Sequence, residues 1–490
     1  MFEKECIPFA PSLIESMRSL GYSFPSAIAD LIDNSISANS KNIKIISDPS
    51  DNPFLIILDD GEGMDSEKLY EAMRYGSTNP LEERDEKDLG RFGLGLKSAS
   101  LSQCRVLVVV SKQKNSICAF AWDLDYVIEK GQWMLKGFTE DELKDFPYID
   151  QLHALSNGTY IYLNEFDRIK ESTGNVAETF NKCLNDMTDH LSLVFHRFIE
   201  EDGICISLNN SKISAKDPFL SDHKATQRKK ESYVYIKDAK IVLKPFILPH
   251  LSKLSPEDLE KVGGKENLRN NQGFYVYRNK RLIIWGSWFR LEHKDELNKL
   301  ARVRVDIPNS LDYMWSIDIK KSTATLPDII KKNMYNAVYD SVLSSEAVHT
   351  YRGRKEKKKD DIEYVWERVK VRQGYEYVIN RDIPQIKLFE ESLNDKQVKM
   401  LNKIIDTLEE SFPVAALYVD AAKGNIEEKP PQDEKEKTDE IWADLMQQMN
   451  YVKKNGLSEV DYYKAFMKVE PYCNYPEIKT RIEEEIHKYE

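Results

Sequence analysis

The sequence lacks any long hydrophobic run, and this absence is the first limit on its class. In 490 residues no stretch reaches the roughly 20 apolar residues that a membrane-spanning helix needs. The first residues, M1-F-E-K-E-C-I-P8, also lack the basic-then-apolar order of a signal peptide. We therefore expect a cytoplasmic protein without membrane contact.

Paired cysteines and excess positive charge are missing as well. The six cysteines form no C-x-x-C pair and have no histidine at zinc-ligand spacing, which argues against metal clips and a disulfide framework. We expect ordinary buried or half-buried thiols. With 70 basic and 82 acidic residues the net charge is −12, so a uniformly basic surface that coats nucleic acid is excluded. Any DNA contact must be local.

What is present is a chain that can bury several cores, since 41% of its residues are hydrophobic. The first 165 residues alternate helical and strand-like patterns, which predicts an α/β sandwich domain over residues 1–198. Helices are expected near 25–39, 66–75 and 176–198, with a short one after residue 95. Strands are expected at 41–47, 54–58, 106–111, 117–122 and 158–163.

A second alternating block, residues 199–350, predicts a separate α+β domain. Its expected strands are 204–208, 240–244, 273–277 and 303–307, with a helix near 326–343. The basic run at 351–359 marks a boundary. Beyond it, residues 351–490 predict a mostly helical region, interrupted near 423–440 by a charged, proline-containing linker. The predicted fold class of the whole chain is α+β.

The first chemical motif is A27-I-A-D-L-I-D-N34 on the expected helix 25–39. Asp30 and Asn34 stand four residues apart and so share a helix face, beside the small Ala27 and Ser37. A carboxylate there can accept a proton, and an amide oxygen can ligate Mg²⁺, which binds oxygen ligands and phosphates. The alternative is a polar face in solvent.

The second motif, D59-D-G-E-G-M64, directly follows an apolar strand. Gly61 and Gly63 permit positive φ and a close approach of the backbone to a flat ring. An acidic side chain at this strand end can accept a hydrogen bond from an exocyclic amine such as that of adenine. The alternative is a simple turn.

The third motif, G90-R-F-G-L-G95, opens a helix, where free N–H groups and the helix dipole suit phosphate oxygens. Its glycine order reverses the dinucleotide fingerprint, and no strand precedes it. Leu96 separates Gly95 from Lys97, which breaks the spacing of a Walker loop.

Together the three motifs resemble the Bergerat fold of the GHKL ATPases, which include gyrase, MutL, histidine kinases and MORC proteins. The second block resembles the transducer domain of the gyrase, MutL and MORC branch, which histidine kinases lack. The sequences of two of these motifs, A29-D-L-I-D-N-S35 and G90-R-F-G-L-G-L-K-S-A-S100, are most similar to those of prokaryotic MORC-like ATPases.

The resemblance implies a role for each matching residue. Asp30 occupies the position of the general base, Asn34 that of the Mg²⁺ ligand, and Asp59 that of the acid that reads adenine. Thr159 would lie beside adenine, and a lysine of the second domain, Lys321 or else Lys320, would reach the γ-phosphate. Other nucleotide contacts are implied for Gly61, Gly63 and Met64 at the base, Ser77 and Thr78 in a lid over residues 76–90, and Gly90, Arg91, Phe92, Gly93, Leu94, Gly95, Leu96 and Lys97 around the phosphates.

Two positions depart from the family pattern. Asp30 stands where the family has glutamate, and its side chain is shorter by one methylene, about 1.5 Å. Ser37 stands where the family has an aspartate near the adenine. ATP binding is expected to survive both changes, and hydrolysis is expected to be slow.

The resemblance implies a Mg²⁺-dependent ATPase whose lid closes on ATP and whose copies form an ATP-dependent homodimer. It also suggests a protein partner, such as a nuclease or methyltransferase of a restriction or anti-phage system. Alternatives are a nucleotide-gated scaffold that hardly hydrolyses ATP, or a mismatch-repair-like or topoisomerase-like subunit that acts on DNA. A chaperone is a less favoured alternative, because the motif sequences resemble those of MORC proteins.

Two local patches could bind DNA. R278-N-K-R-L-I-I-W-G-S-W288 combines basic residues with two tryptophans, but a hairpin tip with core tryptophans explains it equally. The basic run at 351–359 could contact phosphates or serve as a solvated connector.

Overall fold

The computed structural model describes residues 3, 6–19, 21–76, 95–172, 175–236, 239–296, 298–311, 363–371, 374–414, 417 and 434–489. The chain divides into two compact units, Met1–His349 and Thr350–Glu490. Each is described by itself. Within the described ranges, no helix combines the length and the apolar character needed to cross a bilayer.

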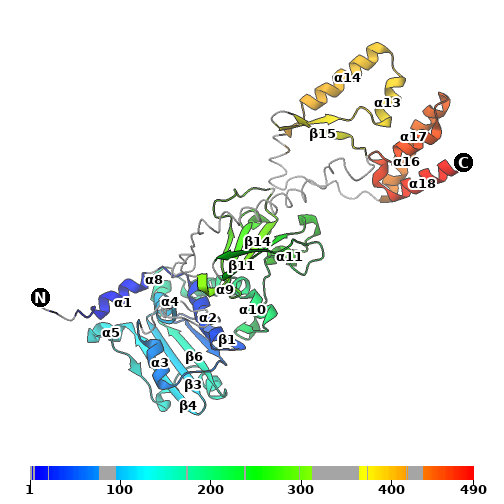
Figure 1. Cartoon of the computed structure of the whole chain (residues 1–490). Coiled ribbons are helices and arrows are strands. Elements are labelled where there is room, and N and C mark those ends of the chain that lie inside the picture. The colour runs from blue at the N-terminus through cyan, green and yellow to red at the C-terminus, as the bar shows by residue number, and fades with distance from the viewer. Residues whose placement is uncertain are drawn as a thin grey trace. The chain divides into compact units, whose positions relative to one another are not determined.

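The first unit begins with an eight-stranded sheet in the order β5-β4-β3-β6-β2-β1-β7-β8, in which only β1 and β7 pair in parallel (Figure 1). Its strands are β1 (Asn42–Asp48), β2 (Phe54–Asp59), β3 (Val106–Gln113), β4 (Ser116–Asp123), β5 (Lys136–Gly137), β6 (Gly158–Asn164), β7 (Cys205–Leu208) and β8 (Ser211–Lys212).

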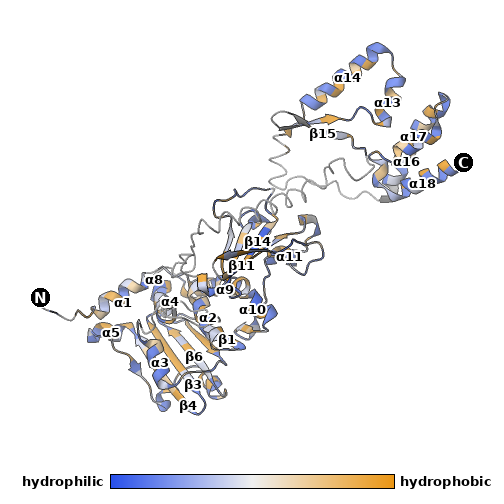
Figure 2. Ribbon diagram, in the orientation of Figure 1, coloured by the Kyte–Doolittle hydropathy of each residue, from blue (hydrophilic) through white to orange (hydrophobic). Residues whose placement is uncertain are grey.

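Helices cover both faces of this sheet. They are α1 (Ala10–Arg18), α2 (Phe24–Ser37), α3 (Ser66–Met73), α4 (Gly95–Gln103), α5 (Leu124–Lys130), α6 (Glu140–Leu143), α7 (Ile149–His153), α8 (Asp167–Ser172), α9 (Val176–Val194) and α10 (His196–Glu201). Because neighbouring residues of a strand face opposite ways, Leu55 and Ile57 join the core under α2 and α9. Ile56 and Leu58 face the other core, under α6 and α7. Figure 2 shows the central strands of this sheet as predominantly hydrophobic.

A second sheet follows, with the order β10-β11-β14-β12-β13 and with β9 paired to β11. Its strands are β9 (Gln227–Arg228), β10 (Ser232–Ile236), β11 (Ala239–Ile247), β12 (Gly273–Arg278), β13 (Arg281–Ser287) and β14 (Ala301–Ile307), and α11 (Pro256–Lys261) precedes β12. Phe246, Tyr275, Tyr277 and Leu282 join the main core of the first sheet, so the two sheets share one hydrophobic interior.

The second unit contains the hairpin β15 (Trp366–Val371) and β16 (Gly374–Ile379) and the helices α13 (Pro384–Glu391), α14 (Asp395–Glu410), α16 (Glu434–Lys454), α17 (Glu459–Phe466) and α18 (Pro476–His487). Leu445, Met449, Phe466 and Ile482 are among the residues that form its core.

The structure confirms the predicted α+β class and corrects five details. The strand at 204–208 belongs to the first sheet, because it pairs in parallel with β1. The helix expected at 176–198 is divided at Phe195 into α9 and α10. The hairpin of residues 366–379 was not expected, and α16 begins at Glu434, inside the predicted linker. Cys6 is exposed rather than buried.

Candidate functional site

Helix α2 carries the first pair of predicted site residues. Ser23 caps the helix by accepting a hydrogen bond from the Ser26 amide at 3.3 Å, and Pro25 lies in the first turn, where its missing N–H costs nothing. Asp30 is 8% exposed, and its Oδ2 accepts a hydrogen bond from the Tyr22 hydroxyl at 3.2 Å. Asn34, one turn later, is exposed. The helix therefore holds the carboxylate inside and presents the amide outside.

Asp30 lines a cavity of about 460 Å³. Its walls come from the start of α2, from α9 and from β13, and consist of Gly21, Ser23, Ser26, Asp30, His190, Arg281, Leu282, Ile283, Ile284 and Trp285. His190 packs against Trp285 with 5.7 Å between ring centroids. Burial and the nearby Arg281 cation lower the pKa of His190 to about 3, so this imidazole is neutral at physiological pH.

Asp59, at the end of β2, is 3% exposed and is held by three donors. Its Oδ2 accepts from the Ser35 hydroxyl at 2.7 Å, and its Oδ1 accepts from the amides of Gly61 at 2.9 Å and Thr159 at 3.2 Å. Burial raises the pKa of Asp59, and the hydrogen bonds oppose that rise. Since two carboxylate oxygens offer about four acceptor positions, the side chain retains capacity for one more donor.

Asp60 has a different role, although it is the next residue. It accepts hydrogen bonds from the Ser40 hydroxyl and from the backbone amides of Lys41 and Asn42 at 2.6–2.8 Å. Burial alone would raise its pKa, but these bonds lower the pKa of Asp60 to about 2. Asp60 thus ties the end of β2 to the start of β1.

The backbone beyond Asp59 comes close to other strands. Gly63 has φ +66°, and a Cβ there would lie 2.0 Å from the Lys112 carbonyl oxygen, so no other residue fits without displacement. The next amide, of Met64, donates to the Ser111 hydroxyl at 2.8 Å, and Ser111 lies 3.2 Å from the Thr159 hydroxyl. A polar pair in β3 and β6 thereby fixes the loop that follows β2.

The start of α4 lies beside Asp30, because a Cβ on Gly95 would be 3.9 Å from the Asp30 Oδ2. The Lys97 side chain points elsewhere. Its Nζ donates to the carbonyl oxygens of Ala72 and Arg74 at 2.8 and 2.9 Å, at the end of α3. If Lys97 contacts a phosphate, it therefore does so through its backbone N–H group. Predicted residues outside the described part are Ser77, Thr78, Gly90, Arg91, Phe92, Gly93, Leu94, Lys320 and Lys321.

The predicted residues that are described gather around the same end of the first sheet. Asp30 and Asn34 come from α2, Asp59 to Met64 from the end of β2, and Thr159 from β6, which pairs with β2 at Asp59. Ser35 and Ser111, which also hold this region, were missed. Ser111 had a signal in the sequence, since it is the first polar residue after the apolar run V106-L-V-V-V110.

The donor set fits a magnesium ion that binds mainly through phosphates. Among the described residues there is no cluster of three or more His, Cys, Asp or Glu side chains that could hold a metal by itself. Asn34 offers one exposed amide oxygen near Asp30. Mg²⁺ bound to a nucleotide commonly needs only one or two protein ligands, with phosphates and water as the others.

Burial withdraws three residues of the R278 to W288 segment from any nucleic-acid surface. Arg278, Arg281 and Trp288 are at most 7% exposed, and the Trp288 Nε1 donates to Gln272 at 3.1 Å. The segment is a hairpin in which Trp288 fills a core, as the alternative interpretation stated, whereas Trp285 is 36% exposed. The basic run at 351–359 lies outside the described residues.

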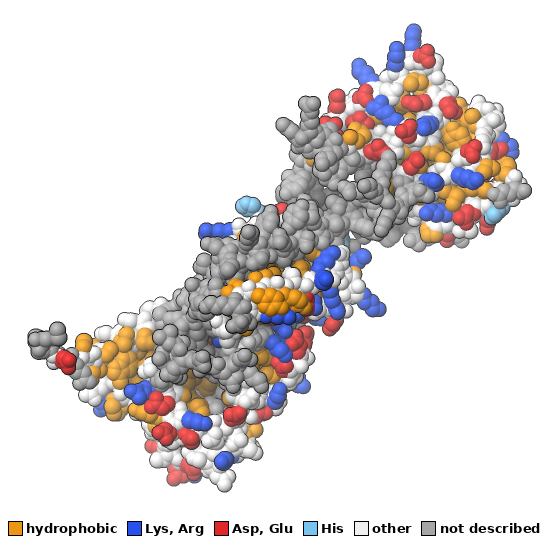
Figure 3. Space-filling view, in the orientation of Figure 1, with side chains coloured by type: hydrophobic (Ala, Val, Ile, Leu, Met, Phe, Trp, Pro, Cys, Tyr) orange, Lys and Arg blue, Asp and Glu red, His pale blue; other side chains and the backbone are white. Residues whose placement is uncertain are grey.

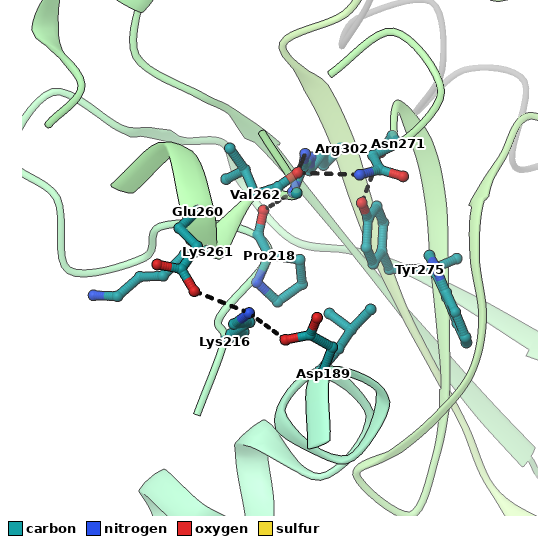
Figure 4. A pocket seen from close by; sticks show the side chains of 12 residues that line it. Asp189, Lys216, Pro218, Glu260, Lys261, Val262, Asn271, Tyr275 and Arg302 are labelled. Carbon is teal, nitrogen blue, oxygen red and sulfur yellow. Dashed lines mark hydrogen bonds and ion pairs between the residues drawn. The ribbon is translucent and has the colours of Figure 1, made fainter. Parts of the chain in front are cut away.

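A second cavity, of about 180 Å³, lies between α9, α11 and the second sheet (Figure 4). Its charged groups are mostly paired. Lys216 bonds to Asp189 at 2.7 Å and Glu260 at 3.2 Å, and the buried Arg302 donates to the carbonyl oxygens of Pro218 and Val262. The Lys216 contacts join α9 to α11, and the Arg302 contacts join β14 to Pro218 and to Val262, which follows α11.

Comparison with known proteins gives the following similarities. Residues 22–159 match the family described as histidine kinase-, DNA gyrase B-, and HSP90-like ATPase. The chain is 35% identical over 95 residues to ATPase morc-1 of Caenorhabditis elegans, covering 19% of this chain and 11% of that protein. It is 30% identical over 96 residues to the DNA mismatch repair protein MutL of Rickettsia bellii, covering 19% of this chain and 16% of that protein.

A solved structure, the crystal structure of the N terminal domain of a DNA repair protein, aligns with 65% of this chain and 95% of its own. The TM-score is 0.40 and the identity 16%. The chain spans only a small part of the length of the two curated relatives, morc-1 and MutL. Its matched part is the segment that contains α2, the end of β2 and the start of α4, and residues 22–159 form a GHKL domain of the histidine kinase-, DNA gyrase B- and HSP90-like ATPase family.

Proposed function

We propose that the first unit binds ATP with Mg²⁺ and hydrolyses it to ADP and phosphate. The observation that carries this proposal is the buried Asp59 carboxylate, held by Ser35, Gly61 and Thr159 with acceptor capacity to spare. An exocyclic amine of adenine supplies the missing donor, and Gly63 and Met64 lie against the base. In the pose in which the 6-amino group of adenine donates to this carboxylate, guanine would present its O6 carbonyl, an acceptor, so adenine is the preferred base.

The phosphate end of the nucleotide lies toward Asp30. Bound Mg²⁺ would neutralise the charge of the phosphates, with Asn34 as its protein ligand. Asp30 orients a water molecule and accepts its proton as the water oxygen bonds to the γ-phosphorus and the bond to the β,γ-bridging oxygen breaks. Backbone N–H groups of Gly90 to Lys97 and the side chain of Lys321 or Lys320 hold the phosphate oxygens.

Hydrolysis is slow in this proposal. The side chain of aspartate reaches about 1.5 Å less far than that of glutamate. This difference exceeds the width of the range of about 2.6–3.2 Å in which a catalytic hydrogen bond forms. Slow turnover makes the nucleotide-bound state long-lived. Such a state suits a switch in which the binding energy of ATP favours one conformation over another.

Closure of a lid over residues 76–90 and pairing of two copies complete the proposed switch. An exposed apolar patch supports the pairing. Ile7, Phe9 and Leu13, at the start of the chain and in α1, are 68%, 63% and 37% exposed. Figure 3 shows hydrophobic side chains gathered at this end of the molecule. Large exposed apolar side chains that lie together mark contact surfaces.

The proposed domain division is a GHKL domain at 1–198, whose sheet is completed by β7 and β8, a transducer-like domain up to 350, and a mostly helical region at 351–490. The transducer-like domain would pass the nucleotide state to a partner. Because one relative is a mismatch repair protein and another a MORC ATPase, we propose a DNA-related role, with a nuclease or methyltransferase of a defence system as the partner.

Phosphate release by the wild type and by Asp30→Ala, each with excess Mg²⁺ and ATP, tests the enzymatic part. We expect slow release by the wild type and a decrease of about 100-fold or more in the variant. Equal background rates in both proteins would remove the ATPase proposal. Retained binding of a fluorescent ATP analogue would then favour the nucleotide-gated scaffold.

A further inference from the structure

A buried ion pair joins the helix of the proposed base to the second sheet. Asp33 lies on α2 between Asp30 and Asn34, and its Oδ1 accepts from the Arg281 Nε at 2.8 Å. Arg281 is the first residue of β13, 248 positions further along the chain. Asp33 is 1% exposed and Arg281 6% exposed. Two charges withdrawn from water in this way are tolerated only as partners.

Further contacts fix the orientation of the Arg281 guanidinium. Its Nη1 donates to the Leu282 carbonyl oxygen at 2.7 Å, and its plane lies over the Phe195 ring, 4.4 Å from the centroid. A planar guanidinium bound on two sides and stacked on a ring has little freedom to turn. The guanidinium therefore holds the Asp33 carboxylate in one orientation. This contact also fixes the turn of α2 that carries Asp30 and Asn34.

The ion pair also lies at the wall of the cavity that contains the proposed base. Arg281 and Asp30 line the same space of about 460 Å³, with β13 on one side and α2 on the other. On a helix, residues three apart are neighbours, so Asp30 and Asp33 lie side by side. A shift of β13 would be transmitted through Arg281 and Asp33 to Asp30.

We propose that Arg281 is a positioning residue for ATP hydrolysis, which acts through Asp33 to hold the Asp30 carboxylate in its working place. The inference rests on the proposed ATPase function and adds the second sheet to its machinery. Arg281 does not touch the reacting atoms. A carboxylate that orients water must be placed to within about 0.5 Å, and misplacement by 1 Å can cost about 100-fold in rate.

The test uses the full chain with the double substitution Asp33→Asn and Arg281→Gln. Both new side chains are neutral and retain hydrogen-bonding groups, so neither leaves a lone buried charge as Arg281→Met alone would. Lys280→Met is the matched control. Lys280 lies one residue away in the same hairpin and also forms ion pairs, to Asp202 at 2.7 Å and Glu201 at 3.1 Å at the end of α10, but it does not contact α2 through them.

In the double variant we expect kcat to fall by about 10- to 100-fold. KM and the affinity for a fluorescent ATP analogue should change by less than about threefold, and Lys280→Met should stay within about twofold of the wild type in all three. A loss of affinity equal to the loss of kcat would show a merely structural role and overturn the inference. So would an unchanged kcat in the double variant.

Hydrogen exchange supplies a second measurement that does not need turnover. A non-hydrolysable ATP analogue with Mg²⁺ should slow amide exchange in β13 of the wild type and of Lys280→Met, but not in the double variant. Equal protection in all three proteins would contradict coupling through Arg281. An active wild type with an equally active double variant overturns the positioning role alone, whereas an inactive wild type overturns both proposals.

Discussion

Asp59 and Asp60 are chemically identical neighbours whose surroundings give them different tasks. Asp60 accepts several hydrogen bonds from the loop between α2 and β1, which saturates it and lowers its pKa to about 2. Asp59 is buried against the sheet with three donors and room for a fourth. One aspartate is therefore structural, and the other is available to a ligand.

Asp59→Asn should separate binding from stability. The Oδ1 of asparagine can still accept from Gly61 and Thr159, and the Ser35 hydroxyl can accept from the new amide, so the fold should persist. The adenine amine would lose its hydrogen bond to a charged oxygen, because the side-chain NH₂ group of asparagine is a donor. ATP affinity should therefore fall by about 10-fold or more, since a hydrogen bond to a charged group contributes about 1.5–3 kcal/mol. Calorimetric titration with ATP and Mg²⁺ measures this.

Asp60→Asn is the matched control for that experiment. It should lower the stability of the fold, because the carboxylate that gathers the loop donors is lost, while the folded fraction binds ATP within about threefold of the wild type. If the two variants lose affinity equally, Asp59 has no special role in reading the base.

Gly63→Ala tests the close approach of the backbone behind the proposed adenine site. The substitution should cost more than the roughly 1–2 kcal/mol of a left-handed backbone alone, because its Cβ would meet the Lys112 carbonyl oxygen at 2.0 Å. Gly131→Ala provides the comparison, since Gly131 has φ +63° and nothing within 4 Å of a Cβ. Urea unfolding of both variants isolates the clash, and equal losses would contradict it.

At the scale of residues, the sequence predicted the side chains with a recognisable chemical motif. It did not predict the residues that hold those side chains in place. Asp59 stands out because it follows an apolar strand and precedes two glycines. Ser35 could not be recognised, because its role depends on how α2 lies across β2. Arg281 gave a misleading signal, since a basic residue near tryptophans suggested a nucleic-acid surface until its buried partner Asp33 was seen.

At the scale of elements, Lys97 joins two helices through a buried amine. It belongs to the first turn of α4 and donates to the last carbonyl groups of α3. Burial lowers the pKa of Lys97 to about 8, below the ordinary value of 10.5. Between these two pH values the unfolded chain binds more protons than the folded protein at this site.

Stability should therefore rise with pH from about 8 to about 10.5 as far as Lys97 determines it. The contribution is at most about 1.4 kcal/mol per pH unit. Urea unfolding of the wild type and of Lys97→Met at pH 7, 8.5 and 9.5 measures it as the difference between the two proteins, in which other titrating groups cancel. A difference that does not change with pH would show that the amine is not destabilised by burial.

Most elements of the first unit could be predicted because their patterns are local. The apolar runs of β2 and β3 and the capped start of α2 need no distant partner to be recognised. The placement of β7 could not be predicted, because only its parallel pairing with β1, about 160 residues earlier, assigns it to the first sheet. The hairpin at 366–379 could not be predicted either, because three of the six residues of β15 are charged and break its apolar pattern.

At the scale of the whole molecule, the two sheets of the first unit share one of its hydrophobic cores. Aromatic residues of the second sheet, including Tyr275 and Tyr277, pack into the core beneath the first. The Asp33 to Arg281 ion pair crosses the same boundary. Movement of one domain against the other therefore requires repacking of buried groups, which favours two discrete arrangements over gradual bending.

The apolar patch at the start of the chain leads to a prediction about assembly. In a two-fold symmetric dimer each copy contributes the same surface, so one substitution removes two contacts. Burial of a phenylalanine contributes about 1.5–3 kcal/mol, and Phe9→Ser should thus weaken dimerisation by about 100-fold or more. Light scattering with a non-hydrolysable ATP analogue and Mg²⁺ measures the mass at several protein concentrations.

Two controls make that result specific. Tyr148→Ser removes another exposed aromatic residue of the same domain, 52% exposed, and should leave the dimer intact. Asp30→Ala should dimerise with ATP itself, because it binds the nucleotide and hardly consumes it. If Phe9→Ser dimerises as well as the wild type, the patch is not the contact surface. If the wild type stays monomeric while it binds the analogue, the nucleotide changes the molecule without pairing two copies, and closure within one chain is the remaining form of the switch.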